Sequence, residues 1–68
     1  MNQDAFQHSI RTLLKNVGVN TQQEIEKAVR QAIDEGKLKG DEHLPARVTV
    51  TVDGIDLALT FDRDITLE

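Results

Sequence analysis

The sequence predicts an α+β fold of the order ααββ. Two helices, at about residues 3–17 and 22–35, are expected to pack on one face of an antiparallel hairpin with strands at about 46–52 and 55–61. The prediction follows from a change in periodicity: apolar residues recur at helical spacing before Pro45 and alternate with polar residues after it. A length of 68 residues leaves room for one small domain, residues 1–68.

The first helix is predicted from one apolar stripe. Its members lie at offsets 0, 4, 7, 8 and 11 and are Phe6, Ile10, Leu13, Leu14 and Val17. Asn2 is a suitable N-cap, because its side chain can accept a hydrogen bond from the first turn. Gly18 is expected to end the helix as a left-handed C-cap residue.

The second helix is predicted from a capping box and a second stripe. Thr21 and Glu24 stand three residues apart, so that each side chain can bind the backbone N–H of the other. Gly36 is expected to end this helix, with Lys37 and Lys39 near its negative end. The apolar members of this stripe are Ile25, Ala28, Val29, Ala32 and Ile33.

The hairpin is predicted from two alternating runs joined by Asp53-Gly54, a dipeptide typical of two-residue turns. This turn would place Val52 opposite Ile55 and all apolar side chains on one face. Residues 65–67 form either a short third strand or a tail. The final two residues, 67–68, are either native or a cloning remnant.

Composition and charge exclude several classes of protein. The chain has no cysteine, which excludes disulfides and thiolate chemistry. Net charge is −4, and residues 41–68 carry seven acidic and two basic side chains, which disfavours nucleic acid and anionic membranes as partners. No apolar run is long enough to cross a membrane, and residues 1–11 lack the features of a signal peptide. We therefore expect a cytoplasmic protein.

No catalytic, cofactor or metal site is predicted. His8 and Ser9 are adjacent in a helix and do not face each other, and His43 has no ligand spacing in common with His8. The segment 36–40 has the glycines and lysines of a phosphate loop, but no Ser or Thr, and it follows a helix end. These patterns do not indicate an enzyme.

The leading functional hypothesis is a small interaction module whose partner is an unknown protein or a second copy. Self-association would pair hairpin edges into a larger sheet, whereas in a monomer solvent or the C-terminal tail would cover those edges. The candidate contact residues lie on the outer hairpin face and in a basic group. They are Arg47, Thr49, Thr51, Ala58 and Thr60, with Lys27, Arg30, Lys37 and Lys39.

The alternative hypothesis is a helix-turn-helix-like regulator that contacts nucleic acid or a transcription protein. Residues 13–21 have the apolar–glycine–apolar order of such a motif, and the hairpin could serve as a wing. The exposed face of the second helix is mixed in charge, however, which weakens this hypothesis.

The sequence also resembles a family of small bacterial proteins that is classed as a domain of unknown function. The resemblance spans nearly the whole chain. It is carried by the start Met1-Asn2-Gln3-Asp4-Ala5-Phe6, by Val17-Gly18-Val19 with the segment 21–30, by the segment 36–40 and by the Val52-Asp53-Gly54 turn. It implies a bacterial, cytosolic, stand-alone protein and assigns no catalytic residue, cofactor or substrate.

Overall fold

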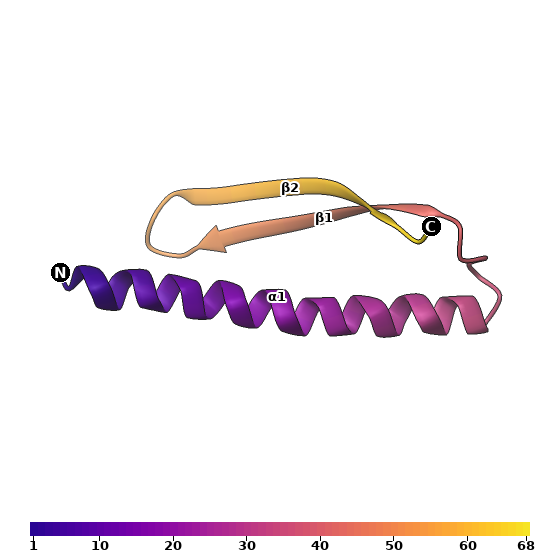
Figure 1. The fold of residues 1–68 in the computed structure, drawn as a ribbon. Helices are drawn as coiled ribbons and strands as arrows, with labels where there is room; N and C mark the ends of the chain where they lie inside the picture. Colours follow the sequence, from indigo (N-terminus) through magenta and orange to yellow (C-terminus); the bar gives the residue numbers. More distant parts are fainter. The chain divides into compact units, whose positions relative to one another are not determined.

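A computed structural model describes residues 1–68 and contains one helix and one hairpin, as Figure 1 shows. The helix α1 spans Gln3–Asp34, and the strands are β1 (His43–Val52) and β2 (Leu57–Thr66). The chain divides into two compact units, Met1–Lys37 and Leu38–Glu68. The first unit holds α1 and the second holds the hairpin.

The prediction of two helices is wrong, because α1 continues through residues 18–21. Gly18 is helical and does not adopt the positive φ of a C-cap. Thr21 is likewise inside the helix, so the predicted capping box does not start a second one. Leu14 and Ile25 are eleven residues apart, close to three helical turns, so the two stripes adjoin. One uninterrupted helix therefore carries a continuous apolar stripe that winds around its axis.

Both ends of α1 agree with the sequence. The Asn2 side chain accepts a hydrogen bond from the Ala5 N–H at 3.0 Å, which confirms Asn2 as the N-cap. At the other end Gly36 has φ +77° and donates to the Ile33 carbonyl at 3.0 Å. Lys37 donates to the Ala32 carbonyl at 2.8 Å. These two hydrogen bonds make a Schellman motif and confirm Gly36 as the helix stop.

The hairpin is present, but its strands are longer and its connection differs from the prediction. Residues 53–56 form the connection, and Val52 pairs with Leu57 instead of Ile55. Gly54 has φ +90° and Asp53 does not have a positive φ, so a two-residue type I′ turn is absent. Residues 65 and 66 belong to β2, which excludes a third strand there.

The observed register is shifted by two residues from the predicted one. An even shift leaves every side chain on its expected face, because side chains alternate with period two along a strand. Val48 pairs with Phe61 and Val50 with Leu59, so the apolar residues still share one side of the sheet. The predicted apolar face is therefore correct, although the predicted register is wrong.

No side chain in the structure is buried, polar or apolar. The more shielded positions, including Val29 and Leu44, are only partly covered. Each unit thus has an amphipathic element without a buried core of its own.

Candidate functional site

The clearest surface of the first unit is the apolar side of α1, which we call the helix stripe. It comprises Phe6, Ile10, Leu13, Leu14, Val17, Ile25, Ala28, Val29, Ala32 and Ile33. Leu13 and Leu14 are 57% and 54% exposed. Exposed apolar patches of this extent mark interaction sites in soluble proteins. The helix stripe is therefore the strongest candidate surface in α1.

Charge is unevenly distributed along α1. Residues 3–18 carry two basic side chains and one acidic side chain, whereas residues 19–34 carry three acidic and two basic ones. The helix dipole has the same polarity, positive at the N-terminus and negative at the C-terminus. The charged side chains nearest the helix stripe are Arg11 in the first half and Glu24 and Glu26 in the second, as helical spacing places them.

The second unit has an apolar face on its hairpin. Val48 and Phe61 form a cross-strand pair and are 47% and 55% exposed. The neighbouring pair, Val50 and Leu59, continues the same face. A two-stranded sheet is marginally stable in water unless such a face packs against something.

The opposite, polar face of the hairpin holds the first group of predicted contact residues. Thr49 pairs with Thr60, and Thr51 pairs with Ala58. Arg47 faces Asp62, and its Nε donates to the Asp62 Oδ1 at 2.8 Å. The structure thus places all five residues on one face, which carries an ion pair that sequence analysis did not anticipate. Since the sheet has only two strands, each strand also has one unpaired edge.

The predicted basic group is divided between the two units. Lys27 and Arg30 are on α1, and Lys37 follows it, with its Nζ 3.0 Å from a Glu35 carboxylate oxygen. That contact is the main reason why the pKa of Glu35 is lowered, with a hydrogen bond from Gln31 assisting. Lys39 lies in the second unit. Its backbone N–H donates a hydrogen bond to the Glu42 carboxylate.

Sequence analysis missed a tight carboxylate turn before β1. The Glu42 carboxylate accepts hydrogen bonds from the backbone N–H groups of Lys39 at 2.8 Å, Gly40 at 2.9 Å and Asp41 at 3.2 Å. The bonds from Lys39 and Gly40 are the main cause of a lowered pKa at Glu42. Gly40 has φ +107°, so the glycine before two acidic residues was the available signal. This turn fixes the start of the hairpin.

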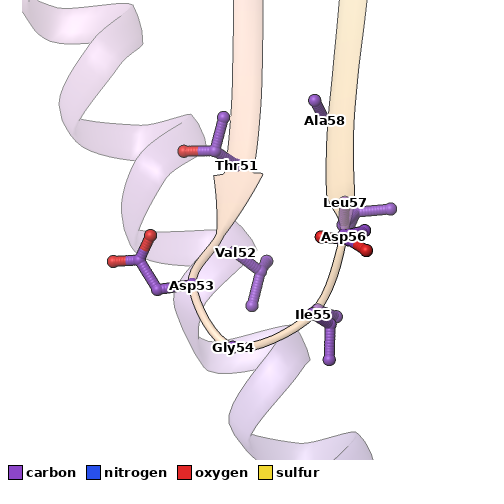
Figure 2. Close-up of a pocket in the computed structure, with 8 residues that line it drawn as sticks. All are labelled: Thr51, Val52, Asp53, Gly54, Ile55, Asp56, Leu57 and Ala58. Carbon is purple, nitrogen blue, oxygen red and sulfur yellow. The ribbon is translucent and has the colours of Figure 1, made fainter.

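A shallow concavity surrounds the hairpin connection and is lined by residues 51–58. Figure 2 shows the Val52 side chain directed toward the inside of the bend and the Asp53 carboxylate directed away from it. The backbone N–H of Leu57 donates to the Ile55 carbonyl at 2.8 Å, which tightens the bend. No group of converging polar side chains is present here, so the concavity does not form a chemical site.

The remaining candidate residues make local contacts. Ser9 donates its hydroxyl to the Phe6 carbonyl at 2.8 Å, and His8 Nε2 lies 3.5 Å from Thr12 Oγ1 on the next turn. His43 begins β1, in the other unit. No cluster of three or more His, Cys, Asp or Glu residues is arranged to hold a metal ion. Since residues 18–21 are helical, the helix-turn-helix geometry is also absent.

No stretch of α1 is both long and apolar enough to cross a membrane. Among the curated proteins and the solved structures, none matches this chain. A family model matches residues 1–68, the full length of both units, and it is described as a family of unknown function (DUF6494). This confirms the resemblance to a family of unknown function. The chain belongs to this family of unknown function, DUF6494.

Proposed function

We propose that the protein is a small, non-enzymatic interaction module that associates with a second copy of itself. The observation that carries the proposal is the absence of any buried side chain in a chain with two amphipathic elements. The helix stripe and the apolar hairpin face are both exposed. Burial of such faces is the main favourable term in protein folding and association.

Each element needs a covered apolar face to be stable. Most of the stability of a protein helix comes from packing of its amphipathic face, and an isolated hairpin is marginal. Chains of this length usually require a metal, a disulfide or association. This chain has no cysteine, which leaves association as the means that its exposed surfaces support.

The non-enzymatic part of the proposal is supported by the environment of the titratable groups. Hydrogen bonds within a local turn lower the pKa of Glu35 and that of Glu42. Burial and neighbouring charges commonly shift the pKa values of catalytic acids and bases. A cytoplasmic location in a bacterium also belongs to the proposal. It fits a chain that is stabilised by association and not by disulfides.

Two surfaces are available for association. The hairpin edges could pair into a larger sheet, in which the face around Thr49 and Thr51 would continue across both copies. The helix stripe could instead pack against a second helix. The stripe has the larger apolar side chains and the longer extent, and both favour it as the interface.

Sedimentation velocity of the full chain tests the proposal. We expect the weight-average mass to rise from 7.6 kDa toward twice that value as concentration increases over about a hundredfold range. Persistence of the dimer at high salt is expected, because apolar contacts are not screened. A mass of 7.6 kDa at every concentration would contradict self-association. A larger complex formed only with another protein would also contradict it.

A further inference from the structure

The helix stripe is uneven in side-chain size. Its first half has large residues at every contact position, beginning with Phe6 and Ile10. Its second half includes two alanines, Ala28 and Ala32. A partner helix therefore fits best when its large residues meet these alanines, because close packing requires complementary volumes.

We propose that two copies pair through their α1 helices in an antiparallel orientation, related by a two-fold axis near residue 19. This inference rests on the proposed function and specifies its interface. In such a pair Ile10 of one copy is level with Ala28 of the other, and Phe6 is level with Ala32. Each contact then occurs twice, as a two-fold interface requires. Two large residues of the first half thus meet the two alanines of the second.

Charge complementarity favours the same orientation. An antiparallel pair places the more basic half of one helix beside the more acidic half of the other. The two helix dipoles also oppose each other. A parallel pair would align like charges and place Phe6 beside Phe6.

The length of the surface also points to a second α1. From Phe6 to Ile33 the stripe runs about 40 Å at 1.5 Å per residue. A ten-residue strand extends about 33 Å. A second copy of α1 has the same length as the first, and its apolar side has the same width.

Cysteine cross-linking tests the orientation, because the native chain has no cysteine. Ile10→Cys and Ala28→Cys are prepared as separate full-length proteins, mixed at a concentration where the wild type is dimeric, and oxidised. We expect the mixture to give a disulfide between the two different chains as its main product. We expect little product from either protein alone. Phe6→Cys with Ala32→Cys provides a second pair at the other end of the stripe.

A matched control uses two positions at the same level on the opposite side of α1. Lys15→Cys and Gln23→Cys keep the same spacing about residue 19 but lie on the side of α1 away from Ile10 and Ala28. We expect no cross-link between them. Circular dichroism of every variant checks that α1 is retained, so a loss of cross-linking cannot be attributed to unfolding.

Each result has a defined meaning. Self-linking of Ile10→Cys would indicate a parallel pair and overturn the inference. If helical variants of both stripe pairs fail to cross-link while sedimentation shows a dimer, the inference fails and the proposed function stands. A monomer in sedimentation would overturn both.

Discussion

Arg47 and Asp62 face each other across β1 and β2, and the Arg47 Nε donates to the Asp62 Oδ1 at 2.8 Å. This pair depends on the observed register, because a two-residue turn at Asp53-Gly54 would have placed Arg47 opposite Thr60. The ion pair and the longer connection are therefore one feature of the hairpin. They also give the polar face of the sheet its only salt bridge.

The register predicts how charge reversal affects the hairpin. We expect Arg47→Asp to destabilise it modestly, because it places two carboxylates opposite each other. The double variant Arg47→Asp with Asp62→Arg should recover most of the loss. Both side chains are well exposed, so the coupling should be about 0.5 kcal/mol or less. Urea unfolding of the four members of the cycle measures it, and a double variant that recovers none of the loss caused by Arg47→Asp would argue against this register.

Continuity of α1 predicts opposite effects for two glycines. Gly18 and Gly36 both have open space at the Cβ position, but only Gly36 has a positive φ. Gly18→Ala should raise stability by about 1 kcal/mol, because alanine is the better helix former. Gly36→Ala should lower stability by about 1 kcal/mol, because it forces a left-handed alanine. Thermal unfolding followed at 222 nm distinguishes them. Destabilisation by Gly18→Ala would instead indicate a break between two helices.

Association through the helix stripe predicts a position-specific effect of added charge. Leu13→Lys should weaken the dimer by at least tenfold, since burial of a lysine in the interface is unfavourable. Thr12→Lys is the matched control, with the same new side chain one residue away and off the stripe. It should leave the dimer intact. Analytical ultracentrifugation of both variants provides the comparison, and equal behaviour would exclude the stripe from the interface.

The turn at Glu42 predicts acid sensitivity at the start of the hairpin. Hydrogen bonds from backbone N–H groups hold the pKa of Glu42 below its usual value of 4.5. Their stabilisation is present above the unfolded-state pKa and is lost as the pH falls through the lowered folded-state value. NMR titration should show the amide protons of Lys39 and Gly40 shifting in that acidic range. In Glu42→Gln, which cannot ionise, this transition should be absent.

Local signals in the sequence identified the ends of elements better than their continuity. Asn2 and Gly36 have the predicted capping roles because each acts through contacts within one turn. Gly18 and Thr21 carry equally recognisable signals. Each is worth only about 1 kcal/mol, however, and a helix interior accommodates both residues. Such a signal does not by itself break a helix, and α1 continues through both residues.

The hairpin shows a different limit. The alternation of Val48, Val50 and Val52 predicts which side is apolar but is equally satisfied by any even shift in register. The alternation does not predict the connection at residues 53–56, which places Arg47 opposite Asp62. The predicted contact residues on the outer face are together because an even shift leaves each on its expected face. Their role in binding remains a prediction.

We infer that folding of this chain depends on association with a second copy. Thermal unfolding of the wild type, followed at 222 nm over about a hundredfold range of concentration, tests it directly. If association supplies the missing core, the midpoint rises steadily with concentration, because mass action favours the dimer over unfolded chains. A midpoint independent of concentration, with full helical signal at the lowest concentration, would show that the chain folds alone and would contradict the claim.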